Sequence, residues 1–140
     1  MPFVRVWIHA VWSTKNRYPY LEKEIRNHLF DHIKENARSK GIFLDRLNGY
    51  LDHIHCLISL DKEQNISKTI QFIKGESSFW INKNSLVNKK FQWQDEYFAV
   101  SVSESNLQAV RDYIDSQEIH HSKKTFQEEY DEFIEKYNFG

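Results

Sequence analysis

The stretch that decides the fold is LDHIHCLISL, residues 51–60. It is rich in apolar and β-branched residues, which predicts a buried β-strand. Successive side chains of a strand point to opposite faces, so His53 and His55 project together from one of them. The opposite face carries the alternate residues Ile54, Cys56, Ile58 and Leu60. The sequence therefore predicts an amphipathic strand that has a core face and a face presenting two imidazoles.

Hydrophobic periodicity predicts the elements on either side of this strand. Apolar residues alternate along half-buried strands and recur at helical spacing along amphipathic helices. By this criterion the predicted elements are a strand over 3–13, a helix over 21–40, a strand over 42–51 that is interrupted or turns near Asn48 and Gly49, a strand over 53–60, a helix over 65–84, a strand over 91–105, and helices over 106–121 and 126–137.

The order of these elements predicts an α+β fold of the ferredoxin-like (βαββαβ) kind, followed by C-terminal helices. In that fold an antiparallel sheet carries both crossover helices on one face. The apolar side of the 53–60 strand belongs under those helices, and the histidine pair belongs on the other face, which we expect to be open. No repeat, linker or low-complexity tract is recognisable, so residues 1–140 are interpreted as a single domain.

Local signals mark where the predicted helices begin and end. Gly41 follows the first helix, at a position where glycine readily adopts a left-handed conformation. Asn65 is a candidate N-cap of the second helix, and Ser105 with Gln108 matches a capping box at the start of the third. Gly75 lies inside the second helix, where glycine costs about 1 kcal/mol relative to alanine. It indicates either close helix packing or close approach to the backbone of a ligand.

The composition is that of a globular protein with little net charge. Of the 140 residues 40% are apolar, and the formal net charge is -1. A nucleic-acid surface would have to come from local clusters of Lys and Arg. The single cysteine, Cys56, excludes an intrachain disulfide and suits a reducing compartment. No signal peptide or membrane-spanning run is recognisable, so we expect a cytoplasmic protein without a membrane partner.

The two histidines are a candidate metal site. Side-by-side imidazoles suit a divalent cation, and the alternative is a pair of ordinary, partly exposed histidines. Two ligands hold a cation poorly, so a third is needed from elsewhere in the chain. Tyr113 and Gln117 lie four residues apart on one face of the helix predicted over 106–121. Alternatively, Tyr113 extends the apolar stripe of that helix and Gln117 is solvated.

The two motifs in this order resemble the single-tyrosine HUH transposases, the small enzymes of IS200-like bacterial insertion sequences and their REP-associated relatives. GYLDHIHCLISL, 49–60, resembles the HUH strand of that family, and YIDSQEIHHSKKTFQEEYDEF, 113–133, is similar to the helix that carries its nucleophile and to the tail of that helix. HAVWSTKNRYPYL, FIKGESSFW and WQDEYFAVSVSES are similar to the family's first strand and loop, its following helix and its last strand. The resemblance covers nearly the whole chain.

The resemblance implies a role for each residue of the two motifs. Tyr113 would be the nucleophile, and His53, His55 and Gln117 would be the ligands of Mg²⁺ or Mn²⁺. Attack on single-stranded DNA would give a 5′-phosphotyrosine and a free 3′-OH, and attack by another 3′-OH would rejoin the strand. The substrate would be the end of a transposon beside a short hairpin. Members of the family are homodimers whose tyrosine helix can complete the active site of the partner subunit.

Other residues are candidates for support or for DNA contact. Asp52 either orients an imidazole or serves the entry into the strand. His120 and His121 either stabilise a helix C-terminus or contact DNA or a ligand. The acidic segment 127–137 is expected to pack on the body or on a partner rather than to contact DNA. The residues selected for DNA contact are His9, Lys15, Arg17, Lys74, Lys123 and Lys124. His9 lies on the mixed face of the first strand, so we also expect it close to the metal face.

The resulting hypothesis is a metal-dependent, single-tyrosine DNA transposase. An alternative within the class is a REP-associated or domesticated relative that nicks hairpins without moving its own gene. A second alternative is a non-catalytic nucleic-acid-binding module, which would tolerate Tyr113→Phe and would not depend on a metal. A third is a dimeric structural protein, in which His53 and His55 could be replaced with no loss beyond stability.

Overall fold

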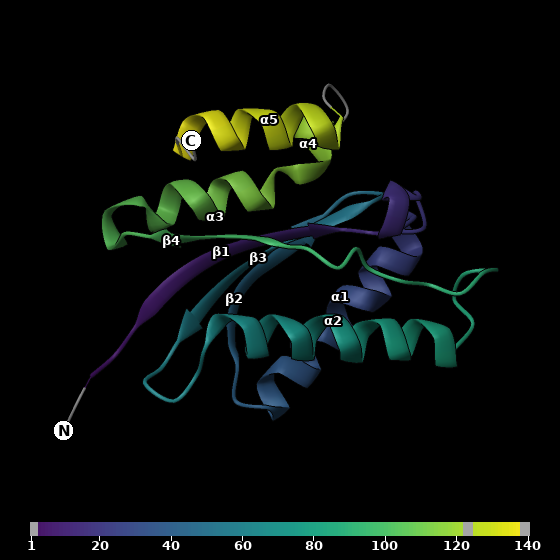
Figure 1. Cartoon of the computed structure of the whole chain (residues 1–140), viewed down its shortest axis with the longest axis horizontal. Helices are drawn as coiled ribbons and strands as arrows, with labels where there is room; N and C mark the ends of the chain where they lie inside the picture. The colour runs from purple at the N-terminus through teal and green to yellow at the C-terminus, as the bar shows by residue number, and fades with distance from the viewer. Residues whose placement is uncertain (1–2, 122–124, 138–140) are drawn as a thin grey trace.

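An antiparallel sheet forms the centre of the protein (Figure 1). The computed structural model describes residues 3–121 and 125–137. Within these residues four strands pair in the order β2-β3-β1-β4, and they are β1 (Val6–Ser13), β2 (Phe43–Gly49), β3 (His53–Leu60) and β4 (Phe98–Val102). The helices are α1 (Lys23–Ser39), α2 (Ile66–Lys83), α3 (Leu107–Asp115), α4 (Gln117–His121) and α5 (Phe126–Tyr137), with short 3-10 turns η1 (Lys15–Arg17) and η2 (Glu104–Asn106).

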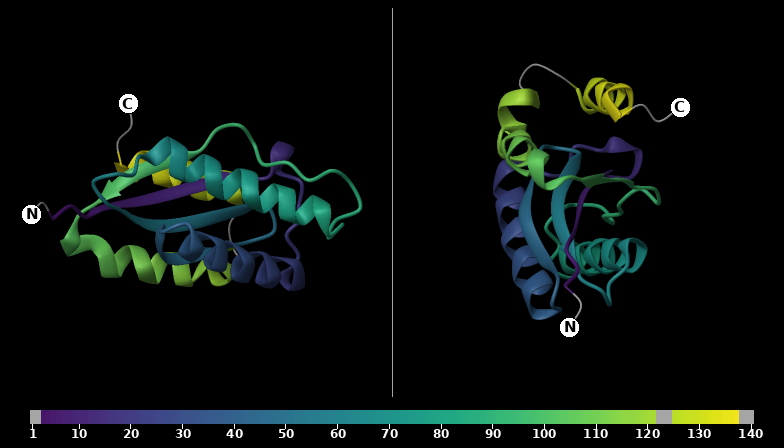
Figure 2. Two further views of the ribbon diagram at one scale, coloured as in Figure 1. Left: turned by 90° about the horizontal axis from the view of Figure 1, so that it is seen from below. Right: turned by 90° about the vertical axis from the view of Figure 1, so that its left-hand side faces the viewer.

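The strand order confirms the ferredoxin-like α+β fold. α1 connects β1 to β2, α2 connects β3 to β4, and both helices lie on one side of the sheet (Figures 1 and 2). The apolar sides of β1 and β3 face this layer, and the residues buried there include Ile8, Ala10, Trp12, Ile54, Cys56 and Ile58. Removal of this surface from water is the main force that holds the layer together. In the part of the chain that the structure describes, no helix has the length and apolar character needed to cross a bilayer.

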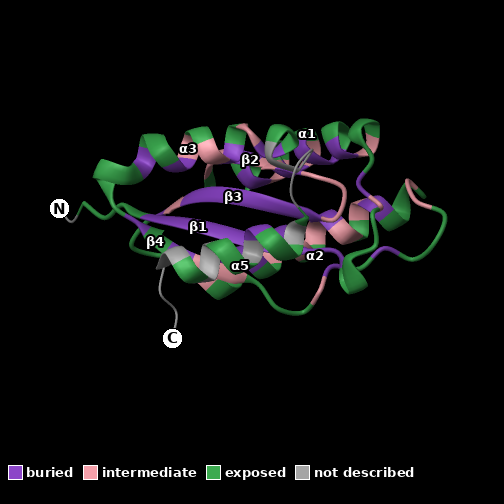
Figure 3. Cartoon of the chain, turned by 90° about the horizontal axis from the view of Figure 1, so that it is seen from above, coloured by how far each residue is buried: buried purple, intermediate pink, exposed green. Residues whose placement is uncertain are grey.

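The second face of the sheet is covered, so the expectation that it lies open is wrong. α3 lies over β2 and β3, and the chain turns back after α4 so that α5 runs in the opposite direction over the same face (Figures 1 and 3). The apolar stripe of α3 must be removed from water, and Trp7 and Leu57 offer it an apolar partner. The second hydrophobic cluster contains Trp7, Leu57, Val102, Leu107, Val110 and Ile114.

The first and last strands are both shorter than predicted. β1 begins at Val6, and β4 comprises only Phe98–Val102. Residues 91–97 follow an irregular path, with an isolated bridge between Thr14 and Trp93. The ammonium of Lys74 on α2 accounts for this path, because it binds the carbonyl oxygens of Gln94, Asp95 and Glu96 at 2.6, 3.1 and 3.4 Å. These carbonyls are directed at α2 instead of a neighbouring strand.

Two of the local helix signals are confirmed, one is wrong, and one of the two readings of Gly75 is excluded. Gly41 has a φ of 79°, and the side chain of Asn65 accepts a hydrogen bond from the backbone N–H of Lys68. The predicted capping box at Ser105 does not form, because the turn η2 precedes α3 and no side-chain hydrogen bond caps this described helix. Gly75 is exposed, and a Cβ there would meet nothing within 4 Å, so close helix packing does not explain it.

The helix predicted over 106–121 is two helices with a break at Ser116. This residue has φ −100° and ψ 20°, so α3 ends before it and α4 begins after it. The side chain of Asn48 on β2 donates hydrogen bonds to the carbonyls of Ile114 and Asp115, at 2.8 and 3.3 Å. These carbonyls close the C-terminus of α3, where the helix leaves them without intrahelical partners. The break matters because Gln117 is the first residue of the new helix.

Candidate active site

Two buried imidazoles lie side by side on β3. His53 and His55 are 0% and 1% exposed, with ring centroids 5.2 Å apart. Their Nε2 atoms face the same carboxylate, which belongs to Glu129 on α5. His55 Nε2 lies 3.0 Å from Oε1, and His53 Nε2 lies 3.4 Å from Oε2. The histidine pair thus faces an acidic group that the C-terminal helix supplies.

The Nδ1 atom of each ring contacts a polar side chain on the side away from Glu129. His53 Nδ1 lies 2.9 Å from a carboxylate oxygen of Asp52, and His55 Nδ1 lies 3.0 Å from Nε2 of His9. A proton on Nδ1, held by such a partner, directs the Nε2 lone pair outward for a cation. Asp52 and His9 are therefore positioned to orient the two imidazoles.

The position of His9 corrects its assignment as a DNA contact. The residue is 0% exposed, and its ring stacks on that of His55 with centroids 5.2 Å apart. β1 and β3 are neighbours in the sheet, so side chains on the same face of the two strands are in contact. His9 lies behind the imidazole pair and offers no surface to DNA in this arrangement.

The surroundings of the histidine pair favour a positive charge. Burial opposes protonation of His53, but its contacts with Asp52 and Glu129 outweigh burial and raise its pKa above the ordinary value of 6.5. A site that stabilises a protonated imidazole in this way also stabilises a cation bound at the same position. The electrostatics therefore agree with a metal site.

Tyr113 on α3 reaches the same carboxylate. Its hydroxyl donates a hydrogen bond to Oε1 of Glu129, and its ring lies edge-on to that of His55 with centroids 5.6 Å apart. Burial, together with the charge and hydrogen bond of Glu129, raises the pKa of the phenol well above its ordinary value of 10.0. The phenol is therefore protonated in this conformation, and its oxygen points to the centre of the site.

Gln117 joins the group from the start of α4. Its side chain is fully buried, and its Oε1 lies 3.2 Å from Nε2 of His53. Its Nε2 donates to Oε1 of Glu129 at 3.2 Å and to the carbonyl of Tyr113 at 3.3 Å. The fold thus gathers the residues of the two sequence motifs, the histidine pair with the tyrosine and the glutamine, around one point.

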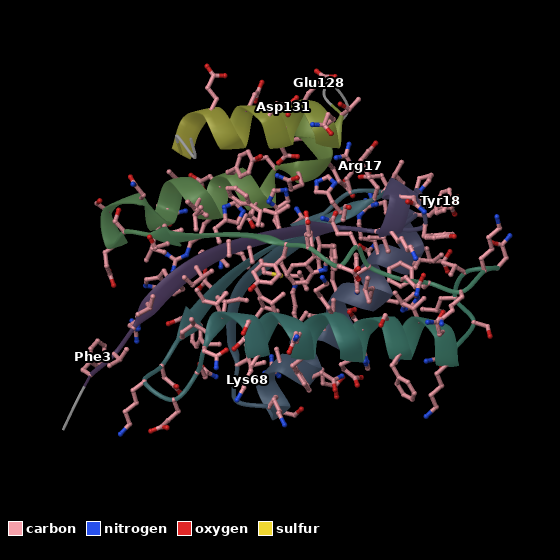
Figure 4. The ribbon with its side chains drawn as sticks, viewed as in Figure 1. Phe3, Arg17, Tyr18, Lys68, Glu128 and Asp131 are labelled. Atoms are coloured by element: carbon pink, nitrogen blue, oxygen red, sulfur yellow. The ribbon has the colours of Figure 1, made fainter. Side chains whose placement is uncertain are left out.

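Glu129 is not among the residues selected from the sequence. It is 5% exposed, whereas Glu128 and Asp131 on the same helix are exposed and point away from the sheet (Figure 4). A signal for its burial exists in the spacing of α5. Glu129 follows Phe126 by three residues and precedes Phe133 by four, which places it on the apolar face of an amphipathic helix.

The donor atoms fit a divalent cation. One ligand atom from each of His53, His55 and Glu129 lies within 4.8 Å of the others, and the amide oxygen of Gln117 lies beside them. Imidazole nitrogens and carboxylate or amide oxygens are common ligands of divalent cations in proteins. These residues form a candidate metal centre next to a tyrosine hydroxyl.

The basic residues selected for DNA contact lie in different environments. Lys15 and Arg17 are exposed in η1, at the opposite end of β1 from Phe3 (Figure 4). Lys74 is engaged with carbonyls of residues 94–96, and burial lowers its pKa, so it holds this segment instead of facing DNA. Outside the described residues lie Lys123 and Lys124 and the side chains of His120 and His121.

Ion pairs fix the two helices that carry the tyrosine and the glutamine. Arg111 of α3 donates to the carboxylate of Asp45 in β2 at 2.7 Å, and this contact raises the pKa of the Arg111 guanidinium. Arg26 of α1 is buried and donates to the carboxylate of Glu118 in α4 at 2.6 Å. The site residues are therefore held on helices that are tied to the rest of the same chain.

Comparison with known proteins identifies the family. The family model of IS200-like transposases matches residues 3–117. The chain belongs to this family. The match contains both histidines of β3, the tyrosine of α3 and Gln117, and it ends before Glu129. The resemblance to IS200-like transposases that the sequence motifs indicate is thus confirmed.

Individual relatives of this IS200-like transposase agree with the assignment. The ISDra2 transposase TnpA of Deinococcus radiodurans is 27% identical over 114 residues, which cover 78% of this chain and 81% of the relative. A solved transposase structure from Deinococcus radiodurans R1 has a TM-score of 0.66 at 24% identity and covers 81% of this chain and 91% of its own. The structure of a REP-associated tyrosine transposase bound to a REP hairpin has a TM-score of 0.63 at 18% identity. The match covers 86% of this chain and 72% of the chain in that structure. These two structures share the fold.

Proposed function

We propose that this IS200-like transposase cleaves and rejoins single-stranded DNA through a 5′-phosphotyrosine intermediate. Tyr113 is the nucleophile, and His53, His55 and Gln117 bind Mg²⁺ or Mn²⁺. The observation that supports this proposal most directly is the convergence of the tyrosine hydroxyl and both Nε2 atoms on one carboxylate group. A phosphate bound beside that carboxylate would contact the nucleophile and the metal ligands together.

The proposed reaction exchanges one phosphodiester bond for another. The oxygen of Tyr113 forms a bond to the phosphorus, the bond from phosphorus to the 3′ oxygen breaks, and the strand leaves with a free 3′-OH. The phenol loses its proton and the departing oxygen gains one. Because one phosphodiester bond replaces another, the reaction needs no external energy source. Attack of another 3′-OH on the phosphotyrosine reverses these steps and joins the strands. The bound cation would neutralise negative charge that develops on the phosphate.

The protein residues divide this work between positioning and proton transfer. Asp52 and His9 hold the rings of His53 and His55, so that their Nε2 atoms stay directed at the site. Burial and the Glu129 carboxylate raise the pKa of Tyr113, so the phenol starts the reaction protonated and must give up its proton as it attacks.

We propose single-stranded DNA beside a short hairpin as the substrate. The solved REP-associated transposase that shares this fold is bound to a REP hairpin, and Lys15 and Arg17 are exposed basic side chains of the kind that contacts phosphates. A homodimer is part of the proposal. A REP-associated type of nuclease is the alternative within the family, and a non-catalytic nucleic-acid-binding module is the alternative outside it.

The test is the covalent intermediate. Single-stranded oligonucleotides tiled across the DNA that flanks the gene are incubated with protein and Mg²⁺ or Mn²⁺ and then run on a denaturing gel. We expect an adduct that resists SDS and that disappears with Tyr113→Phe and with EDTA. Tiles that bind the protein but yield no adduct would reject the nuclease and favour the binding module.

A further inference from the structure

We propose that Glu129 is a protein ligand of the divalent cation, so that α5 completes the metal centre of this transposase. The inference rests on the proposed function, because it assumes that a cation binds next to His53 and His55. It adds a carboxylate to a set of donors that are otherwise neutral.

The distances between donor atoms agree with shared coordination. Donors bound to one octahedral cation at about 2.1 Å lie about 3.0 Å apart when they occupy adjacent positions. Glu129 Oε1 lies 3.0 Å from Nε2 of His55, and its Oε2 lies 3.4 Å from Nε2 of His53. The amide oxygen of Gln117 lies 3.2 Å from the same atom of His53. These three separations are therefore close to those of adjacent ligands around one ion, and one ligand atom from each of His53, His55 and Glu129 lies within 4.8 Å of the others.

The charge of the site supports the same role. Two imidazoles and an amide carry no charge, so they leave the double charge of the cation uncompensated in a buried position, where uncompensated charge is unfavourable. Glu129 is 5% exposed and supplies one negative charge at that position. Mg²⁺ and Mn²⁺ also favour carboxylate oxygens as ligands.

The carboxylate is held in place by its neighbours. Gln117 donates its amide N–H to Oε1 of Glu129 at 3.2 Å, and the hydroxyl of Tyr113 donates to the same oxygen. Donors of this kind orient a ligating carboxylate and tune its affinity for metal. The family match ends at Gln117, so this ligand comes from a part of the chain that lies beyond it.

The experiment measures Mn²⁺ binding by the full chain without DNA. Free Mn²⁺ is followed by electron paramagnetic resonance during titration of wild type, Glu129→Gln and Glu128→Gln. Glu129→Gln keeps the size of the side chain and removes the charge. Glu128→Gln makes the same change at an exposed neighbour on the same helix, and is the matched control. We expect Kd for Mn²⁺ to rise about tenfold or more in Glu129→Gln and to be unchanged in Glu128→Gln.

An equal or lower Kd in Glu129→Gln would overturn the proposal. An equal Kd would mean that the carboxylate does not contact the metal. A lower Kd would mean that it occupies the site in competition with metal and DNA, and adduct formation would then rise in this variant. Circular dichroism and thermal unfolding show whether each variant folds. If Glu129→Gln does not fold, Glu129→Asp is compared with Glu128→Asp, because it keeps the charge and withdraws the oxygens; an unchanged Kd there would equally reject a ligand role.

Failure of the proposed function would look different. It would show as a wild type that binds Mn²⁺ and DNA but forms no Tyr113 adduct. The role of Glu129 is decided by the Mn²⁺ titration, which needs neither DNA nor turnover.

Discussion

At the scale of single residues, the two imidazoles of the site are supported by different chemistry. His53 is backed by the carboxylate of Asp52, and His55 is backed by the imidazole of His9. For His55 to present its Nε2 lone pair, its Nδ1 must carry the proton, and Nε2 of His9 must accept it. His9 is therefore a positioning residue, and the tautomer of His55 sets the tautomer of His9.

We predict that His9→Phe weakens Mn²⁺ binding whereas His9→Gln largely preserves it. Phenylalanine keeps the stacked ring but cannot accept a hydrogen bond, and glutamine offers an acceptor oxygen at a similar distance from the backbone. The loss of such a supporting contact typically weakens metal affinity about 10- to 100-fold. Mn²⁺ titration measures the effect. Equal losses in both variants would indicate that His9 acts through packing alone.

The buried thiol of Cys56 gives a stability prediction that depends on pH. Burial raises its pKa above the ordinary value of 9.0. Above pH 9.0 the thiol of the unfolded chain loses its proton and the thiol of the folded chain keeps it, which favours unfolding. The contribution to stability is therefore complete below this pH and falls above it, by up to about 1.4 kcal/mol per pH unit.

Cys56→Ala tests whether this thiol causes the loss of stability at alkaline pH. Urea denaturation at pH values below and above 9.0 should show a smaller fall in the free energy of unfolding in the variant than in the wild type. Below pH 9.0 the variant is expected to be less stable than the wild type, because the removed sulfur leaves a small cavity. The same pH dependence in both proteins would show that another group governs the alkaline loss.

At the scale of elements, the break between α3 and α4 decides where Gln117 points. α4 is short, and its position depends on the ion pair between Arg26 and Glu118, at 2.6 Å. The side chain of Arg26 is 4% exposed and that of Glu118 is 47% exposed. Removing the partner of a buried guanidinium is destabilising, although the exposure of Glu118 reduces the effect.

We predict that Glu118→Gln lowers the free energy of unfolding by about 1–2 kcal/mol and weakens Mn²⁺ binding through Gln117. The control is Lys23→Ala, because Lys23 contacts Glu118 at 3.8 Å with its side chain 73% exposed, and such pairs contribute about 0.5 kcal/mol or less. Urea denaturation and Mn²⁺ titration measure the two effects. An effect of Lys23→Ala as large as that of Glu118→Gln would show that the ion pair between Arg26 and Glu118 is not what holds α4.

At the scale of the whole molecule, the candidate active site is assembled from both ends of one chain. β1 and β3 form its floor, and α3, α4 and α5 form its cover (Figures 1 and 3). The helix that carries Tyr113 is tied to its own sheet, since Arg111 pairs with Asp45 and the side chain of Asn48 holds the end of α3. This arrangement favours use of the tyrosine with the histidines of the same chain.

Mixing two inactive variants tests this arrangement. Tyr113→Phe retains the metal ligands, and His55→Ala retains the nucleophile. If each chain uses its own tyrosine, a mixture co-purified after joint refolding forms no more adduct than either variant alone. Each variant refolded with wild type is the control for assembly. Recovery of adduct in the mixture would show that α3 serves the partner subunit.

Much of this fold could be predicted from local patterns. β3 and α5 have the predicted bounds, and α1 and α2 are within two residues of theirs. Hydrophobic periodicity is strong in these segments, and local signals such as Asn65 act on their own neighbours. β1 begins at Val6 instead of residue 3. The larger errors concern β4 and the helix over 106–121, where Lys74 and Asn48 bind the backbone from distant parts of the chain.

The sequence by itself determined the order of strands and helices, the faces of β3, and the pairing of two motifs that identify the family. These properties depend on spacing along the chain, which is visible without coordinates. Only the tertiary structure decided that the histidine face is covered, that His9 stands behind His55, and that Glu129 lies at the centre of the site. Each of these depends on contact between segments far apart in the chain, and no local pattern specifies such contacts.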